Sequence, residues 1–420
     1  MPTRRTFLQQ GAALGALGLT ARYSFAAPAA GDARFVFVIL RGALDGLAAV
    51  PPYGDPDYAR LRGALAIAAP GAADGALRLD GTFGLHPALQ FLHEAYEAKE
   101  LLPLHAVSTP YRERSHFDGQ DVLESGLALP HASQTGWLNR ALVGLPANAI
   151  RGKEGGVALG QNVPLVLRGP APIASWSPSQ LPAIDDDTLQ RIVDRYASEP
   201  LLAQRLAEAL AADQIATEAQ AGSMADQGMA TTAQPSAGDS IQQRGAAPPA
   251  GRYLDTVRTA AAFLTRADGP SVAVFDTTGW DTHFNEGGAQ GQLRARLGAL
   301  DQSLRALKEG LGSSWSRAVV LLATEFGRTA AANGTRGTDH GTGAAAFLLG
   351  GAVAGGRVLA DWPGLSERAL YQGRDLKPTL DLRLVAKSVL HDHLRIGARN
   401  LDNDVFRDSG KAYLSDLVRA

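Results

Sequence analysis

Short apolar runs alternate along the chain with longer segments of helical periodicity. The run at residues 35–40 (FVFVIL) is too short and too rich in branched side chains for a buried helix, so it predicts an interior parallel strand. Further strands are predicted at Leu101–Val107, Val163–Leu167, Ser271–Phe275, Ala318–Ala323 and Ala344–Leu349. Helices are predicted at His86–Lys99, Ser115–Glu124, Thr188–Ala211, Tyr253–Thr265, Gln292–Leu311 and Leu382–Leu394. This alternation predicts an α/β fold, with a mostly parallel sheet and helices on both faces.

One segment departs from this pattern. Gln214–Gly251 is rich in Ala, Gln, Ser, Thr, Gly and Pro and contains no aromatic residue. Such a composition cannot bury enough apolar surface to offset the entropy of ordering, so the segment is expected to be a disordered insertion. Because no repeat or second boundary is evident, residues 27–420 are expected to form a single domain.

The N-terminus has the features of an export signal. Arg4 and Arg5 precede a small, weakly apolar run at Gly11–Leu19, and Ser24-Phe25-Ala26 offers small residues for a signal peptidase. The run is shorter than the ~20 residues that a spanning helix needs. Residues 1–26 are therefore expected to be a twin-arginine signal peptide, read by the twin-arginine export machinery, and no membrane anchor is expected after cleavage. The mature protein is expected to be periplasmic or secreted.

The composition limits the compartment and the kinds of binding partner that are expected for the protein. The chain has no cysteine, so nothing in it requires an oxidising compartment. Its formal charge of −2 becomes −5 once a leader with three arginines and no acids is removed. This balance gives no basic surface for nucleic acid.

Acidic and histidine side chains follow several predicted strands, where an α/β sheet usually binds its ligand. They are Asp45 after the first strand, Asp281 and His283, Glu325, and the adjacent pair Asp339 and His340. Each segment alone is as well explained by a polar turn or a helix cap. Several at one sheet edge predict a site for one or two divalent metal ions, zinc or manganese.

The order of the polar segments resembles a known family. Arg41-Gly-Ala-Leu-Asp45-Gly, Arg114-Ser115-His116-Phe117, Gly279-Trp-Asp281-Thr-His283, Thr324-Glu325-Phe-Gly327-Arg328 and Gly337-Thr-Asp339-His340-Gly resemble the motifs of a bacterial, twin-arginine-exported family of unassigned function. That family belongs to the alkaline phosphatase-like superfamily. The resemblance implies an alkaline phosphatase-like fold and a small anionic ester as substrate.

The superfamily also implies roles for individual residues. Metal ligands would be Asp45, Asp281, His283, Asp339 and His340. Ser115 would be the nucleophile, since it would cap the helix predicted through Glu124, whose N-terminus favours an anion. Arg114 and His116 beside it are further catalytic candidates, and Arg114 or Arg112 could hold a phosphate or sulfate through two hydrogen bonds.

One superfamily feature is missing. A third metal-binding histidine is expected near the end of the chain, but only His391 and His393 follow His340, late in a predicted helix. The shell could instead be completed by Asp381, Glu325, His86 or His116. Three functions therefore stay open: an exported phosphatase or sulfatase, a non-catalytic binding or assembly protein with an exported partner, and a phosphomutase-like transferase.

Overall fold

The computed structural model describes residues 32–178, 186–196, 198–226 and 250–419. The expected signal peptide at 1–26 lies outside the described residues, as does the stretch 227–249 of the expected insertion. None of the helices in the described ranges is long and apolar enough to cross a membrane.

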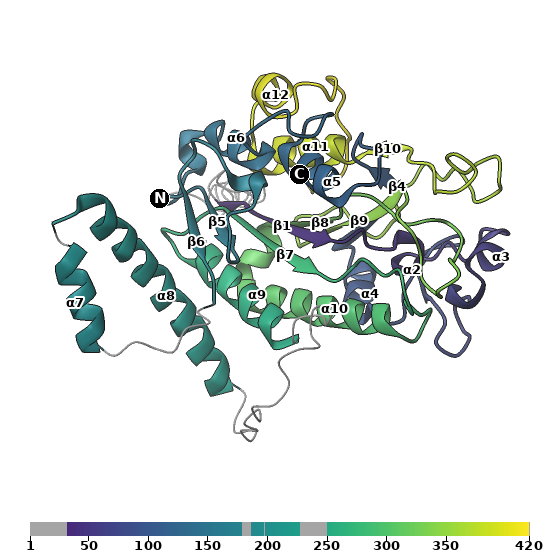
Figure 1. Ribbon diagram of the computed structural model, residues 1–420, viewed down its shortest axis with the longest axis horizontal. Helices are drawn as coiled ribbons and strands as arrows, with labels where there is room; N and C mark the ends of the chain where they lie inside the picture. The colour runs from purple at the N-terminus through teal and green to yellow at the C-terminus, as the bar shows by residue number, and fades with distance from the viewer. Residues whose placement is uncertain (1–31, 179–185, 197, 227–249, 420) are drawn as a thin grey trace, which may run out of the picture.

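An eight-stranded sheet forms the centre of the molecule, in the order β10-β4-β9-β8-β1-β7-β5-β6 (Figure 1). Strands β2 and β3 form a separate two-stranded sheet. The strands are β1 (Arg34–Arg41), β2 (Leu77–Arg78), β3 (Gly84–Leu85), β4 (Leu101–Ser108), β5 (Gly156–Leu159), β6 (Ile173–Trp176), β7 (Val272–Thr278), β8 (Ala318–Ala323), β9 (Ala344–Leu349) and β10 (Leu380–Asp381). Among the described strands of the large sheet, only β9 runs antiparallel to its neighbours.

The two faces of the sheet bury separate halves of the core. On β1, Val36, Val38 and Leu40 pack in one apolar cluster, whereas Phe35 and Phe37 pack in the other. Alternate side chains of a strand point to opposite faces, so both faces must be covered. The expected α/β fold, with a mostly parallel sheet and helices on both faces, is confirmed.

Helices α4, α9 and α10 cover one face, and α5, α6 and α11 lie on the other (Figure 1). The helices are α2 (Gly46–Ala49), α3 (Tyr58–Arg62), α4 (Gln90–Glu97), α5 (His116–Ser125), α6 (Trp137–Val143), α7 (Asp186–Tyr196), α8 (Pro200–Asp226), α9 (Ala250–Thr265), α10 (Gln292–Leu311), α11 (Leu382–Leu394) and α12 (Ala398–Asn400).

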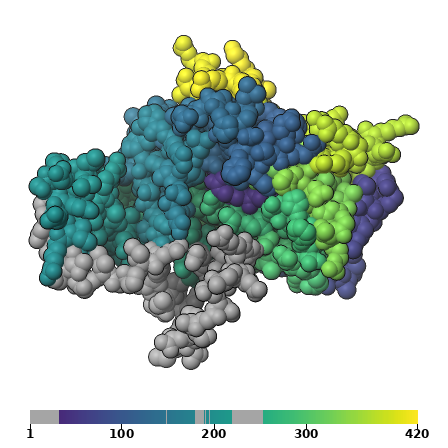
Figure 2. Space-filling model, in the orientation of Figure 1, coloured from purple at the N-terminus to yellow at the C-terminus, as the bar shows by residue number. Residues whose placement is uncertain are grey.

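Two regions differ from the sequence expectation. The strand expected at Val163–Leu167 is instead a 3₁₀ turn at Leu165–Leu167, and the sheet is extended by β5 and β6, which the sequence did not reveal. The helix expected at Thr188–Ala211 is divided into α7 and α8, and Pro200 begins the second because proline suits a first helical turn. Helix α8 continues through Gln214 to Asp226, so this part of the expected insertion is helical. Both helices lie at one end of the molecule (Figure 2).

A buried histidine in β4 makes stability depend on pH. The Nε2 of His105 lies 3.0 Å from the Val50 carbonyl oxygen, and its Nδ1 accepts from the Ala106 N–H at 2.8 Å, so the neutral ring satisfies both partners. Burial lowers the pKa of His105 from 6.5 to about 4. The contribution of the neutral His105 ring to the free energy of unfolding is therefore fully present above pH 6.5 and is lost as pH falls toward 4.

We expect His105 to account for about 2 kcal/mol of the unfolding free energy lost between pH 8 and pH 5. Urea unfolding of His105→Gln, whose amide keeps a donor and an acceptor but does not titrate, should show a correspondingly smaller loss. His131→Gln, at an exposed position, is the matched control. Equal pH dependence in the wild type and His105→Gln would contradict the assignment.

Candidate functional site

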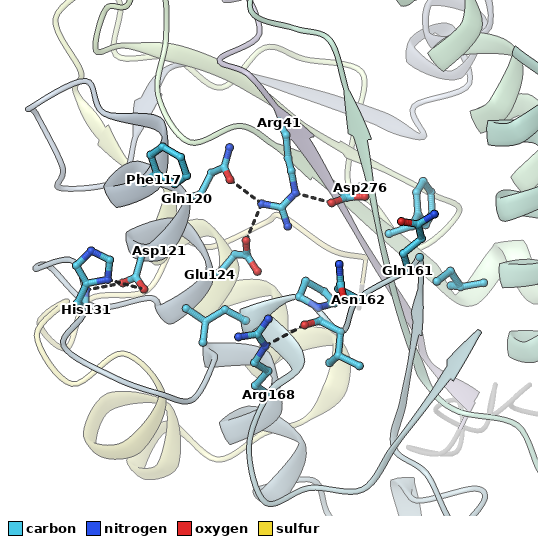
Figure 3. Close-up of a pocket in the computed structure, with 16 residues that line it drawn as sticks. Arg41, Phe117, Gln120, Asp121, Glu124, His131, Gln161, Asn162, Arg168 and Asp276 are labelled. Atoms are coloured by element: carbon cyan, nitrogen blue, oxygen red, sulfur yellow. Dashed lines mark hydrogen bonds and ion pairs between the residues drawn. The ribbon is translucent and has the colours of Figure 1, made fainter. Parts of the chain in front are cut away.

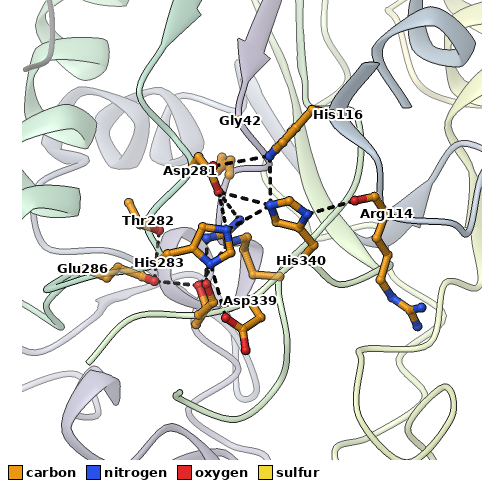
Figure 4. Close-up of polar contacts among 12 residues, drawn as sticks. Gly42, Arg114, His116, Asp281, Thr282, His283, Glu286, Asp339 and His340 are labelled. Atoms are coloured by element: carbon orange, nitrogen blue, oxygen red, sulfur yellow. Dashed lines mark hydrogen bonds and ion pairs between the residues drawn. The ribbon is translucent and has the colours of Figure 1, made fainter. Parts of the chain in front are cut away.

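Several loops meet at one edge of the large sheet (Figure 4). The parallel strands β4, β7 and β8 end there, and they lead to α5, to the loop with Asp281 and His283, and to Glu325. Because β9 is antiparallel, the loop that precedes it and carries His340 reaches the same edge. Helix α5 begins at His116 and ends at Ser125, and it is followed by Gly126, whose left-handed φ of 71° suits glycine.

Three histidine nitrogens and one carboxylate converge at this edge. The Nε2 of His340 lies 3.0 Å from the Nε2 of His116 and 3.0 Å from that of His283. The Asp281 carboxylate lies 3.0 Å from His283, 3.4 Å from His340 and 3.5 Å from His116, measured to the same Nε2 atoms. We call these four residues the donor cluster. Ligands bound tetrahedrally at about 2.1 Å from zinc lie about 3.4 Å from one another. The ligand atoms of His116, Asp281 and His340 all lie within 4.8 Å of one another and fit one ion, whereas His283 contacts this group from the side of His340 and Asp281.

Each histidine of the donor cluster is held through its other ring nitrogen. The acceptors of the three Nδ1 atoms are Glu325 Oε1 for His116 (2.7 Å), the Arg114 carbonyl oxygen for His340 (2.9 Å) and Asp339 Oδ1 for His283 (3.2 Å). These partners assign the proton to Nδ1 and leave a lone pair on Nε2. Lone pairs 3.0 Å apart repel, so the arrangement calls for a cation, either a proton or a metal ion, among the Nε2 atoms.

The charges around the donor cluster fit the same conclusion. The buried Arg328 donates to Asp281 at 2.7 Å. Although partial burial opposes it, hydrogen bonds from His116, His340 and Arg328 hold the pKa of Asp281 below its usual range. Hydrogen bonds to Asp281 and Glu325 raise the pKa of His116 to about 9. A metal ion would compete with this proton for the Nε2 lone pair, since only the deprotonated ring is a ligand.

A buried glutamate joins two of the loops that carry the donor cluster. Glu286 Oε2 accepts from the hydroxyl of Thr282 at 3.0 Å and from that of Thr338 at 2.7 Å. The loops also approach closely at Gly337, where a Cβ would lie 2.3 Å from the His283 carbonyl oxygen. The sequence did not point to Glu286, because an acid in a loop carries no periodic signal.

Asp45, expected to be a metal ligand, lies outside the donor cluster. Its Oδ1 accepts from the backbone N–H groups of Leu47 and Ala48 and caps α2, and its Oδ2 is paired with the buried Arg62. Burial alone would raise the pKa of Asp45, but the guanidinium of Arg62 lowers it. With both oxygens occupied and the side chain 1 % exposed, Asp45 supports the fold of this edge.

Arg114 and Asp339 also have places other than those expected. The Arg114 guanidinium binds Asp375 at 2.9 Å and Gln372 at 2.7 Å and points away from the donor cluster, so only its carbonyl oxygen serves the site (Figure 4). Asp339 accepts from Asn333 at 3.1 Å as well as contacting His283, and it orients that ring from outside the donor cluster.

Ser115 lies between two residues that contact the site. It directly precedes His116, and it directly follows Arg114, whose carbonyl holds His340. Ser115 occupies the position before the first turn of α5, but its side chain makes no capping hydrogen bond. Its hydroxyl is therefore not used to stabilise the helix.

Of the residues considered for completing a metal shell, His116 alone lies in the donor cluster. Both ring nitrogens of His86 are engaged by backbone groups, and Asp381 caps α11. Glu325 is fully buried behind His116 and receives its Nδ1–H.

Comparison with known proteins gives a family and distant structural neighbours. No curated protein matches the sequence. A 2-O GAG sulfatase is 12% identical, with 91% of this chain and 73% of that chain covered and a TM-score of 0.34. A candidate sulfatase from Bacteroides thetaiotaomicron is also 12% identical, with 91% and 76% covered and a TM-score of 0.29.

The family match covers most of the described fold. Residues 95–405 match the model of the family described as "Protein of unknown function (DUF1501)". This span contains all four residues of the donor cluster and the outer partners Arg114, Glu325 and Asp339. The chain therefore belongs to the DUF1501 family.

Proposed function

We propose that the protein is an exported, divalent-metal-dependent hydrolase of phosphate or sulfate esters, with an alkaline phosphatase-like active site. The observation that carries this proposal is the donor cluster, in which the Nε2 atoms of His116 and His340 and the Asp281 carboxylate have the separations of ligands to one ion, with His283 beside them. Outer hydrogen-bond partners of this kind fix the ring orientation of metal-binding histidines.

The ion would be held by His116, Asp281 and His340, and His283, 3.0 Å from His340, is the candidate for a fourth ligand. Zinc suits a set dominated by imidazole nitrogen, and manganese is the alternative where oxygen contributes more. One ion is favoured over two, because the side chains of Asp45 and Asp339 are engaged outside the donor cluster. A bound ion would act as a Lewis acid toward an oxygen of the ester.

Access to the donor cluster favours a catalytic role. Asp281 is 42% exposed and His116 is 24% exposed, so one side of the cluster faces solvent. A substrate oxygen or a water molecule can therefore approach the four side chains. Structural metal sites are usually closed by their ligands, whereas catalytic sites keep an open position.

Ser115 is the proposed nucleophile. Its hydroxyl makes no capping hydrogen bond, and the first backbone N–H groups of α5 lack partners within the helix and favour an anionic oxygen. The Ser115 oxygen would form a bond to phosphorus or sulfur as the bond to the alcohol oxygen breaks. The serine proton would leave to solvent and the alcohol would gain one, and water would then release the anion.

A second function rests on the number of donors. If His283 joined the other three residues, four protein ligands would fill a tetrahedral zinc shell, as in structural sites. In that case the protein would be a non-catalytic binding or assembly protein of the periplasm. Both functions predict a bound metal ion, and only the first predicts hydrolysis of an ester.

The deciding experiment uses protein matured in its own host. We expect elemental analysis to give about one zinc or manganese per chain, and we expect the protein to hydrolyse 4-nitrophenyl phosphate or 4-nitrophenyl sulfate in a way that EDTA abolishes. Bound metal without turnover of either ester would favour the second function. Folded protein that binds neither metal would refute both.

Substitutions of arginines in the expected signal peptide test export through the twin-arginine route. We expect Arg4→Lys with Arg5→Lys to retain the precursor in the cytoplasm, because the paired arginines are the recognition feature of that route. Arg22→Lys, which changes the third arginine of the leader, is the matched control and should be exported normally. Cell fractionation and blotting give the readout, and normal export of the double variant would exclude the route.

A further inference from the structure

A cleft lies beside the donor cluster, along α5 (Figure 3). Its volume is about 660 Å³, which is within the range of small-molecule sites. Phe117, Gln120 and Glu124 of α5 line it, and His116 of the donor cluster begins the same helix. The opposite wall is the loop at 159–165.

Most charged groups of the cleft are paired with one another, and Arg168 donates to the Val163 carbonyl oxygen at 2.9 Å. Arg41 pairs with Glu124 at 2.8 Å and with Asp276, and it also donates to Gln120 at 3.1 Å (Figure 3). The Asp121 carboxylate lies 3.5 Å from the ring of His131. The cleft therefore offers no cluster of unpaired cations for a second anionic group, which favours a neutral polar ligand.

Other groups in the cleft are free to bind such a ligand. Across the part of the chain that the structure describes, the side-chain amides of Gln161 and Asn162 have no hydrogen-bond partner, and both line the cleft. Each amide has two donors and an acceptor, which suit neighbouring hydroxyl groups. Phe117 is 86% exposed and presents an apolar ring at the same cleft. Amides and an exposed aromatic ring suit a ligand with a hydroxyl-rich rim and an apolar face.

A hydrogen-bond chain connects the cleft to the donor cluster. Gln120 donates to Glu325 Oε1 at 3.2 Å, and the same oxygen accepts from His116 Nδ1 at 2.7 Å. One wall of the cleft therefore also positions a proposed metal ligand. A ligand in the cleft would lie against the helix that carries His116.

We propose that the cleft binds a neutral sugar ring, which forms the alcohol portion of the ester. The inference rests on the proposed function only for the ester group; recognition of the ring depends on Phe117, Gln161 and Asn162. It narrows the substrate class to sugar phosphates or sugar sulfates.

Saturation-transfer NMR with the methyl glycosides of glucose, galactose and mannose tests the cleft without turnover. We expect at least one glycoside to bind both the metal-loaded and the EDTA-treated protein, because the cleft lies outside the donor cluster. Phe117→Ala should weaken binding about fivefold, since it removes the apolar ring, and Asn162→Ala should also weaken it. Phe284→Ala is the matched control: this ring is 65% exposed and follows a donor histidine, but it does not line the cleft.

The outcomes separate this inference from the proposed function. Binding of no glycoside, or equal binding by wild type and Phe117→Ala, would overturn the inference even if the protein hydrolyses aryl esters. Glycoside binding that Phe117→Ala weakens would support the cleft even if no ester is turned over. Both variants change exposed side chains, so circular dichroism should show them folded.

Discussion

His340→Ala should lose its metal, with zinc affinity reduced by about 100-fold or more. His340 is central to the donor cluster, since its Nε2 lies 3.0 Å from two other Nε2 atoms. Loss of an outer partner of a metal-binding histidine typically costs 10- to 100-fold in affinity, and loss of the ligand itself should cost at least as much. Competition with a chromogenic zinc chelator measures the affinity, and hydrolysis should disappear with the metal.

Two further variants test whether the effect is specific. Glu325→Gln keeps the volume of the side chain but weakens the acceptor for His116, so we expect affinity to fall by about 10- to 100-fold. His131→Ala removes an exposed histidine outside the donor cluster and should leave zinc affinity unchanged. Stoichiometric zinc in His340→Ala after extensive dialysis would show that the donor cluster is not the metal site.

Ser115→Ala should keep its metal and lose its activity. Under the proposed mechanism only the nucleophile is removed, so turnover should fall by about 10³-fold or more. The side chain makes no capping hydrogen bond, so the free energy of unfolding should change little. Metal content, kcat with the preferred 4-nitrophenyl ester and a urea unfolding curve together distinguish a lost nucleophile from a damaged fold.

The matched control is Ser313→Ala, at an exposed serine remote from the donor cluster in sequence and on a different element. It should behave as wild type in all three measurements. If Ser115→Ala retains full turnover while His340→Ala has none, then the attacking group is not Ser115, and the metal-dependent hydrolase would need a water nucleophile.

Hydrophobic periodicity predicts the long elements well. β8, β9, α10 and α11 begin and end at the expected residues, because each is a strongly patterned segment with a clear boundary. β5 and β6 were not predicted, since each has only four residues, and an apolar run at Val163–Leu167 competed with them. That run contains Pro164, which fits the turn that forms there better than an interior strand.

Prediction of the site residues from the sequence is limited in a different way. Sequence order indicates which loops follow which strands, and therefore that Asp281, His283 and His340 share an edge. It does not distinguish an aspartate that binds a metal from one that caps a helix, because both follow a strand in a polar turn; Asp45 is the cap. The place of His116 in the donor cluster depends on the approach of α5 to β8, which no local pattern encodes.

The shared carboxylate of Glu286 has a consequence for the speed of metal exchange. Glu286 accepts hydrogen bonds from Thr282 and Thr338, and it therefore orders both loops through contacts that do not involve the donor cluster. A chelator would then remove an ion from a binding site that is already formed, and a new ion would enter without a loop having to refold. We therefore expect exchange at the centre to be limited by ligand substitution around the ion, and to show little of the temperature dependence of a conformational opening.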